Sequence, residues 1–476
     1  MKPIRPRLVF ALFLALTVLL VQAPSNARSA ATDQLKTYLP LVSRMSKPSK
    51  PSIFGFEVRP EVIASDTDVV KQAASQLGAH WSRMNIISWR AVQPTLDRNY
   101  NWAALATFEQ ALAKNIELKL EPVVIIDDSP RWATVKPTAC GAIKDEYHAD
   151  FAAFMVALVN RYKDRVHYWE LGNEPDVDPS LVEQDNVFGC WGDIADPYYG
   201  GERYGRMLRV VAPAIRQADP AAQIVLGGLL LATPNTTEVG RGKPEKFLEG
   251  VLRAGAASSF DILAYHTYPS YPNQQIDYDL EAGNGWKAYG GWTVGKARFL
   301  QSVMQSYQIN KPLWLNETGL LCTPPYADCT NPTPAFFQAQ ADYVVRIMSR
   351  AAAYGIQQVS WYTLDGPGWR NASLLDGDQK PRLVYTAYQQ FILRVGQYYG
   401  IAATTYSVET EAYRFNKEAT VVDVVWSRDS TVRTVEVPTD RFIAAYSWDG
   451  AALTPRLGAA VQLDVGFTPI YIERTP

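Results

Sequence analysis

Eight short apolar stretches alternate with amphipathic segments over most of the chain, and this alternation restricts the fold more than any other feature of the sequence. The segments between the apolar stretches repeat apolar residues at helical spacing, as in Ser65–Gly78, Asn101–Lys114 and Phe336–Tyr354. We expect strands at Ile53–Val58, Ala79–Met84, Leu118–Ile126, Val166–Leu171, Gln223–Leu229, Asp261–Tyr265, Pro312–Asn316 and Gln358–Tyr362.

Strands that alternate with helices require a parallel sheet covered by helices, and eight such units predict a closed (β/α)8 TIM barrel of the α/β class. We place this barrel at residues 52–396 of the 476-residue chain, which is long enough for a barrel and a smaller domain. An open doubly wound sheet is the alternative. No GxGxxG or GxxxxGK loop follows the first strand, which counts against a nucleotide-binding sheet of that kind.

The pattern changes after about Tyr399, where short β-branched or aromatic runs are separated by Asp, Gly, Asn and Pro turns. These runs are Ala412–Phe415, Thr420–Trp426, Val432–Val437, Ile443–Trp448, Val461–Val465 and Pro469–Glu473. They predict a small all-β sandwich over residues 397–476. The sandwich could pack against the barrel or bind a polysaccharide, and we favour packing because its turns show no obvious row of aromatic residues.

The first 27 residues have the pattern of a signal peptide. Lys2, Arg5 and Arg7 precede the apolar run Leu8–Val21, and small residues before Arg28 allow cleavage after Ala27. An uncleaved membrane anchor is the alternative. Residues 28–51 are rich in Ser, Lys and Pro and are interpreted as a linker. We therefore expect a protein secreted to the periplasm or the medium, with no membrane contact after cleavage.

Cysteine content and charge limit the partners of the chain. In a secreted protein the four cysteines favour disulfides over metal ligands. Of the three possible pairings we prefer Cys322 with Cys329, which share one loop, and Cys140 with Cys190. A formal net charge of −2 gives no electrostatic basis for nucleic-acid binding. The chain has four histidines and no HExxH motif, so we expect no metal and no other cofactor.

Two glutamates occupy equivalent positions in the repeating pattern. Glu174 follows the fourth predicted strand in the stretch Val166–Asp176, and Glu317 follows the seventh in Pro312–Gly319. Because a barrel gathers the carboxyl ends of its strands at one rim, these two carboxylates should meet there. Cleavage of a glycosidic bond needs one carboxyl group to protonate the leaving oxygen and a second to attack or to activate water. The pair therefore predicts glycoside hydrolysis, whereas two unrelated surface acids are the alternative.

Other polar or aromatic residues also fall at predicted strand ends, which a hydrophobic core would not require. They are Glu57, Arg83, Asp127, Asp128, Asn173, His266, Tyr268 and Trp361. We expect this set to line the same rim as the two glutamates.

The motif Asn173-Glu174-Pro175 after the fourth strand, with Glu317 after the seventh, resembles the clan of retaining glycoside hydrolases on (β/α)8 barrels. This clan includes the family 5 cellulases and mannanases and the family 39 xylosidases. The resemblance spans about Ile53–Val395, and the all-β tail is similar to the sandwich that follows the barrel in family 39. It implies that Glu174 is the acid/base and Glu317 the nucleophile.

The resemblance also implies roles for the neighbouring residues. Asn173 would bond the sugar 2-hydroxyl, Arg83 would keep the nucleophile ionised, and His266 and Tyr268 would border the carboxylates. Glu57 stays a candidate substrate-binding residue from its strand-end position. Trp361 would form the floor under the sugar, and Trp132 would supply a further platform.

The alternatives are a rim ion pair for Arg83, a satisfied buried histidine for His266 and a core position for Trp361. The third strand ends in Asp127-Asp128, where family 5 often has a histidine, and this departure counts against a cellulase.

We expect a monomeric enzyme that cleaves β-glycosidic bonds of oligo- or polysaccharides with retention of configuration. A non-catalytic carbohydrate-binding barrel and an inverting hydrolase are the alternatives. The identity of the glycan, and whether its ends or its interior are cleaved, depend on loops that the sequence pattern does not determine.

Overall fold

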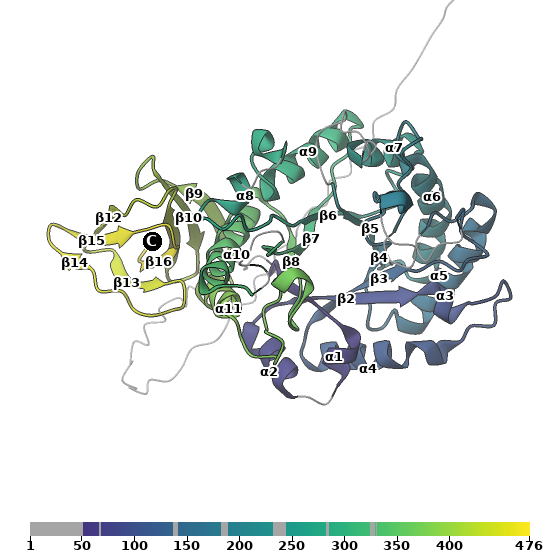
Figure 1. The fold of residues 1–476 in the computed structure, drawn as a ribbon, viewed down its shortest axis with the longest axis horizontal. Helices are drawn as coiled ribbons and strands as arrows, with labels where there is room; N and C mark the ends of the chain where they lie inside the picture. Colours follow the sequence, from purple (N-terminus) through teal and green to yellow (C-terminus); the bar gives the residue numbers. More distant parts are fainter. Residues whose placement is uncertain are drawn as a thin grey trace, which may run out of the picture. The chain divides into compact units, whose positions relative to one another are not determined.

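A computed structural model describes residues 51–65, 68–136, 141–181, 189–231, 244–281, 285–323, 329 and 331–476. Eight parallel strands form a closed barrel in the order β1 to β8, and Figure 1 shows them as a ring enclosed by helices. Their bounds are β1 Phe54–Val58, β2 Trp81–Ser88, β3 Glu121–Asp127, β4 Tyr168–Leu171, β5 Gln223–Leu229, β6 Ile262–Thr267, β7 Leu313–Thr318 and β8 Gln358–Trp361. The predicted TIM barrel is confirmed, and each strand overlaps the range expected from the sequence.

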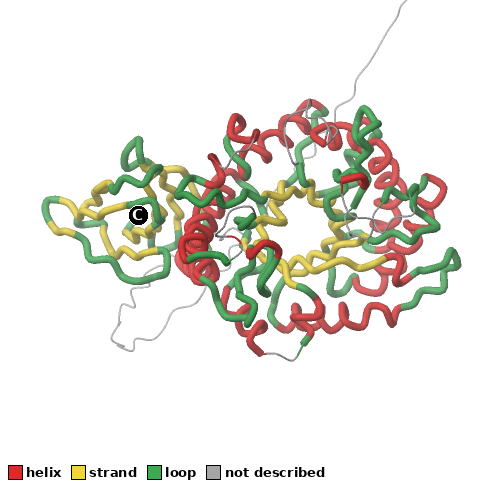
Figure 2. The backbone as a smooth tube through the Cα atoms, viewed as in Figure 1, coloured by secondary structure: helices red, strands yellow, loops and turns green. Residues whose placement is uncertain are grey.

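The helices lie outside the strands and connect them, as Figure 2 shows in red around the yellow barrel. Their bounds are α1 Pro60–Ala64, α2 Asp68–Leu77, α3 Trp89–Val92, α4 Ala106–Glu117, α5 His148–Tyr162, α6 Gly201–Ala218, α7 Phe247–Arg253, α8 Tyr278–Glu281, α9 Thr293–Ser306, α10 Pro334–Tyr354 and α11 Leu383–Val395. The longest of them, α10, begins with Pro334 and is capped after Tyr354 by Gly355, whose φ of +93° suits a residue without a Cβ.

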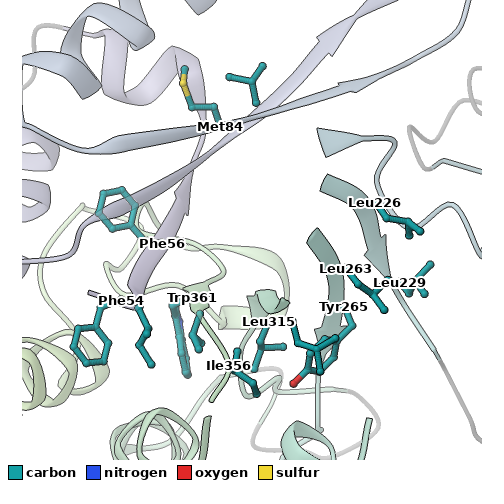
Figure 3. Packing of buried hydrophobic residues seen from close by; sticks show 14 of the residues in the cluster. Phe54, Phe56, Met84, Leu226, Leu229, Leu263, Tyr265, Leu315, Ile356 and Trp361 are labelled. Atoms are coloured by element: carbon teal, nitrogen blue, oxygen red, sulfur yellow. The ribbon is translucent and has the colours of Figure 1, made fainter. Parts of the chain in front are cut away.

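Strands covered on both faces explain the continuous apolar runs in the sequence. In β6 and β7 every residue is buried, because one face packs on the helices and the other fills the barrel. Figure 3 shows Phe54, Leu263 and Leu315 among the side chains of the main core. A second layer inside the barrel contains Trp81 and Trp314, whose ring centroids lie 5.1 Å apart.

The C-terminal strands form two antiparallel sheets, which confirms the predicted sandwich. A five-stranded sheet has the order β13-β16-β11-β10-β9, and a three-stranded sheet has the order β12-β15-β14. The bounds are β9 Gly400–Thr404, β10 Thr410–Asn416, β11 Val421–Ser427, β12 Arg433–Pro438, β13 Phe442–Ser447, β14 Arg456–Leu457, β15 Ala460–Val465 and β16 Ile470–Arg474. The sequence pattern did not predict β9 and β14, because neither contains a buried residue.

One predicted disulfide is confirmed, since Cys322 and Cys329 are bonded. The other expected pair includes Cys140, which lies outside the described residues, as do the predicted signal peptide and all of the linker except Pro51. Among the helices in the described part of the chain, none combines the length and the apolar character needed to cross a membrane.

Candidate active site

Glu174 and Glu317 meet at the carboxyl-terminal rim of the barrel. Glu174 lies three residues beyond the end of β4, and Glu317 is the penultimate residue of β7. Both are largely buried, with exposed fractions of 5% and 7%. One carboxylate oxygen of Glu174 lies within 4.8 Å of one of Glu317. The barrel thus brings together two acids that are far apart in the sequence.

The turn after β4 is fixed by hydrogen bonds that the strand itself does not provide. Asp127, at the end of β3, accepts a hydrogen bond from the backbone N–H of Asn173 at 3.1 Å. The backbone N–H of Glu174 donates to the carbonyl oxygen of Gly228 at 3.1 Å. Gly172 and Glu174 have φ values of +84° and +50°, so the chain turns sharply there. This turn aims Glu174 across the rim instead of along the strand.

Arg83 connects the carboxylates of three strands and is fully buried. Its Nη1 donates to both Glu57 and Glu317, while Nε and Nη2 form a bidentate pair with Glu170 at 2.8 and 2.9 Å. Nη2 also donates to Asn173 Oδ1 at 2.7 Å. Arg83 lies within β2 rather than at its end, because β2 continues to Ser88. A single guanidinium therefore faces three acids inside the barrel.

This imbalance of charge separates the pKa values of the neighbouring acids. Burial acts to raise the pKa of Glu317, but electrostatic interactions with His266 and Arg83, with a hydrogen bond from Tyr268, outweigh it and hold the pKa below its usual value. Burial, with the negative charge of Glu317 as a further contribution, raises the pKa of Glu57 to about 8 despite its contact with Arg83. Glu317 is therefore ionised at neutral pH, where Glu57 retains its proton.

His266 and Tyr268 border the two glutamates, as expected. The Nδ1 atom of His266 lies 2.9 Å from Glu174 Oε1 and 3.5 Å from Glu317 Oε2. The phenol of Tyr268 donates to Glu317 Oε2. Burial and the adjacent Glu317 raise the pKa of Tyr268 well above its usual value, so the hydroxyl remains a donor. These contacts orient each carboxylate separately.

Asn173 and Trp132 have positions compatible with the roles expected for them. Because Asn173 Oδ1 accepts from Arg83, the amide is oriented with its N–H donors available, and Nδ2 has no partner among the described residues. Trp132 is half-buried; its indole donates to Pro94 O at 3.1 Å, and its ring meets Trp89 and Tyr147 edge-on.

Trp361 requires a correction, because it has no exposed surface on which a sugar could stack. Its exposed fraction is 0%, its indole donates to Ala372 O at 2.7 Å, and Figure 3 shows it within the core. The half-buried residue is the next one, Tyr362, whose ring centroid lies 5.9 Å from that of Tyr268. Trp369 is 48% exposed and also contacts the Tyr268 ring edge-on, at 5.7 Å.

The sequence pattern missed buried polar residues within the strands and helices. Glu170 is completely buried in β4 and, besides Arg83, accepts hydrogen bonds from Gly228 N and Asn316 Nδ2 at 3.0 and 2.9 Å. Lys296, from α9, is also buried and donates to the carbonyl oxygens of Leu230 and His266 at 2.6 and 2.8 Å. The sequence signal for each was a charged residue inside an otherwise apolar segment. That signal did not indicate which groups Glu170 and Lys296 would contact.

Glu174, His266 and Glu317 also have the spacing of a metal site, since one ligand atom from each lies within 4.8 Å of the others. Their existing contacts suit proton transfer better than metal binding. Both oxygens of Glu317 already accept hydrogen bonds, from Arg83 and Tyr268. A divalent cation at this point would lie beside the Arg83 guanidinium and would be repelled by it.

Several solved structures share this fold. A family 39 glycoside hydrolase from Bacteroides cellulosilyticus WH2 is 18% identical, with a TM-score of 0.65, and the match covers 90% of this chain and 81% of that chain. A glucosidase from Croceicoccus marinus is 13% identical, with a TM-score of 0.61 and coverage of 90% and 97%. The family 30 subfamily 8 xylanase Xyn30A from Clostridium acetobutylicum is 12% identical, with a TM-score of 0.59 and coverage of 90% and 98%. No curated protein sequence matches the chain.

The chain has the fold of these glycoside hydrolases, and its match to a family model, which also implies a carbohydrate substrate, places it in the glycoside hydrolase class. Residues 45–365 match the family described as Cellulase (glycosyl hydrolase family 5), which is more than half of the chain, and the protein belongs to this family. The resemblance inferred from Asn173-Glu174-Pro175 is thereby confirmed at the level of the family.

Proposed function

We propose that the protein is a secreted, retaining β-glycosidase in which Glu317 is the nucleophile and Glu174 the acid/base. The observation that carries this proposal is the distance within 4.8 Å between one carboxylate oxygen of each residue. Retaining enzymes separate their two carboxyl groups by about 5–5.5 Å, whereas inverting enzymes need about 6.5–9.5 Å to admit a water molecule. The short separation supports direct attack on the sugar.

In the first half-reaction, an oxygen of Glu317 forms a bond to the anomeric carbon while the bond from that carbon to the leaving oxygen breaks. Glu174 transfers its proton to the leaving oxygen and becomes a carboxylate. Arg83 and Tyr268 support this role of Glu317, because they keep it ionised and fix the direction of its oxygens. The product is a glycosyl ester on Glu317, and the leaving group departs as an alcohol.

In the second half-reaction, Glu174 accepts a proton from water as the water oxygen attacks the same anomeric carbon. The ester bond to Glu317 breaks, and both carboxyl groups return to their starting states. Two inversions give net retention. His266 supports this step by holding Glu174 in place, since its Nδ1 lies 2.9 Å from Glu174 Oε1.

The substrate in this proposal is a β-linked oligo- or polysaccharide. The available N–H donors of Asn173 suit a sugar 2-hydroxyl, and Glu57 in its protonated form can donate a hydrogen bond to another hydroxyl. Tyr362, Trp369 and Trp132 offer partly exposed rings on which sugar faces can stack. A panel of aryl glycosides and polysaccharides would identify the sugar and the mode of cleavage.

Secretion and the monomeric state belong to the same proposal. The charge pattern before Leu8–Val21 supports export, and the Cys322–Cys329 disulfide is compatible with an oxidising compartment. Mass spectrometry of the exported protein should find Arg28 as its first residue, and size-exclusion chromatography should give the mass of one chain. An intact N-terminus or a stable dimer would contradict these two statements.

Substitution of each glutamate tests the catalytic assignment. We expect Glu317→Gln and Glu174→Gln each to lower kcat by at least about 100-fold with the fold intact by circular dichroism. Glu117→Gln, an exposed position at the end of α4, is the matched control and should retain activity. Azide should restore turnover to an alanine variant at one or both sites. Full activity in either glutamine variant would refute the assignment.

The stereochemistry of the first product tests retention separately. Proton NMR of the first anomer released should show the configuration of the substrate, and the opposite anomer would indicate an inverting enzyme. A non-catalytic binding protein is the alternative from another class. Binding of glycans without release of product, across the same panel, would favour it.

A further inference from the structure

A cavity of about 410 Å³ is lined by residues from both sheets of the sandwich, and its volume falls within the range of about 300–1,000 Å³ that is typical of small-molecule sites. We call it the sandwich cavity. Its lining residues are Thr405, Tyr406, Arg414, Thr434, Glu436, Val437, Pro438 and Arg474. None of them belongs to the barrel.

Two arginines of the cavity share a single buried carboxylate. Arg414, in β10, and Arg474, in β16, both pair with the fully buried Asp423 of β11. Tyr406 donates to the same carboxylate at 2.7 Å. The other acid of the lining, Glu436, is exposed on β12 and accepts from Gln462 at 2.8 Å. One buried carboxylate therefore balances only one of the two guanidinium groups.

Arg474 keeps donors that its ion pair with Asp423 does not use. Arg474 is 7% exposed and donates through Nε to Asp423 Oδ2 at 3.0 Å, whereas its two Nη atoms have no hydrogen-bond partner among the described residues. Arg414 uses Nε and Nη2 on Asp423, at 2.8 and 2.9 Å, and its guanidinium also interacts with the Tyr406 hydroxyl. The paired Nη atoms of a guanidinium match the two oxygens of a carboxylate.

We propose that the sandwich cavity binds a uronic acid residue, with its carboxylate on Arg474 and Arg414. The half-buried ring of Tyr406 offers a face for the pyranose, and Glu436 at the rim offers an acceptor for a sugar hydroxyl. The uronic acid is either a free sugar or one unit of an acidic polysaccharide. This inference goes beyond the proposed hydrolysis, since no catalytic residue lines the cavity.

Calorimetric titration of the full chain with D-glucuronate, D-glucose and acetate tests the ligand class. We expect saturable binding of glucuronate, no binding of glucose at equal concentration, and at least tenfold weaker binding of acetate. Titration with polygalacturonate then separates the two sources, because a site for polysaccharide should bind it more tightly per chain than the free sugar. Absence of glucuronate binding would overturn the proposal, and equal affinity for acetate would overturn the sugar assignment.

Two kinds of variant locate the binding in the cavity. Arg474→Gln should weaken glucuronate binding at least tenfold, but it also removes a partner of buried Asp423 and could affect folding. Thr405 is exposed at the cavity and makes no side-chain hydrogen bond among the described residues, so it gives a cleaner pair. Thr405→Glu should weaken binding at least tenfold by repulsion, and Thr405→Gln, which adds a side chain of the same size without charge, by less than twofold.

The same variants separate this site from the catalytic cleft. Thr405→Glu should leave hydrolysis of neutral substrates unchanged, and Glu317→Gln should leave glucuronate binding unchanged. Equal affinities of the Thr405→Glu and Thr405→Gln variants would place the ligand elsewhere and overturn the proposal. Loss of turnover in Glu317→Gln tests only the proposed hydrolysis, so the two failures can be told apart.

Discussion

Arg83 shows how one buried cation can give two chemically similar acids different states. It contacts Glu57 and Glu317 through the same Nη1 atom, yet the surroundings lower the pKa of Glu317 and raise that of Glu57 to about 8. Two adjacent carboxylates cannot both remain charged beside a single guanidinium at low cost. The proton on Glu57 therefore helps Glu317 to remain an anion.

The variant Glu57→Gln tests these protonation states through the pH dependence of the stability of the fold. In the unfolded chain Glu57 ionises near the ordinary glutamate pKa of 4.5, whereas in the folded chain it keeps its proton up to about pH 8. The native state thus binds more protons in this interval, and the stability of the wild type falls as pH rises through it. Glutamine cannot ionise, so the melting temperature of the variant relative to wild type should rise from pH 4 to pH 8.

Thermal unfolding at pH 4, 6 and 8 is the measurement, with Glu61→Gln as a control at an exposed position nearby. The control should show no such trend. A difference in melting temperature between Glu57→Gln and wild type that is independent of pH would show that Glu57 is ionised in the native state.

The residues that could be predicted from the sequence are those that interrupt an apolar run at its end. Glu174 and Glu317 satisfy this condition, whereas Glu170 lies inside β4, where the pattern indicates only core. Trp361 was wrongly expected on the sugar-binding surface because adjacent residues of a strand face opposite sides. The predicted range of β8 was nearly right. Whether Trp361 or Tyr362 faces the rim depended on the residue at which β8 ends.

At the scale of an element, β5 has no room for side chains where it passes the active site. Gly227 and Gly228 lie next to each other in this strand. A Cβ atom on Gly228 would lie 2.0 Å from His266 Nε2 and 2.7 Å from Asn316 Oδ1, both in fully buried side chains. The glycine therefore provides the space that the imidazole occupies beside Glu174.

Gly228→Ala should displace His266 and with it the orientation of Glu174. We expect a loss of stability of about 1–3 kcal/mol from overpacking and a decrease in kcat of at least about tenfold. Gly377→Ala is the matched control, because a Cβ there meets nothing within 4 Å. Chemical denaturation and steady-state kinetics measure the two effects. Wild-type activity in Gly228→Ala would mean that the position of His266 is not required.

The barrel elements were predictable because buried strands and amphipathic helices have different and regular periods. The two missed strands lack that signal. All five residues of β9 are at least partly exposed, and β14 has only two residues, both exposed. They pair with β10 and β15, which are the next strands in the chain, and each forms the outer strand of a hairpin. A strand that buries no side chain has no apolar alternation by which it could be predicted.

At the scale of the molecule, the barrel and the five-stranded sheet share one core. Phe415, Trp426 and Tyr471 of that sheet belong to the same apolar cluster as the barrel, and Phe391 of α11 contacts the rings of Phe415 and Tyr471. This shared core was not evident from the sequence, since each element only indicates that one of its faces is buried. Barrel and sheet should therefore unfold together.

A buried ionic cluster reinforces this shared core and reaches toward the active site. Arg350, in α10, donates to Glu411 in the sheet at 2.9 Å and to Asp277 and Asp279 at 2.6–3.0 Å. Asp277 and Asp279 lie on the segment that follows β6, the strand that leads into Tyr268. Burial opposes ionisation, but Arg350 holds the pKa values of Asp277 and Glu411 below their usual range.

Arg350→Met should lower stability by about 3–5 kcal/mol at pH 7, because it leaves buried carboxylates without their partner. These acids would then take up protons as pH falls, so the difference in melting temperature from wild type should shrink between pH 7 and pH 4. In wild type Asp277 and Glu411 contribute stability above their unfolded pKa values, and this contribution is lost as pH falls toward their depressed folded ones. Differential scanning calorimetry at both pH values measures this, with the exposed Arg298→Met as control.

We expect one transition for the wild type, because two separate transitions would require a barrel and a sheet that fold independently.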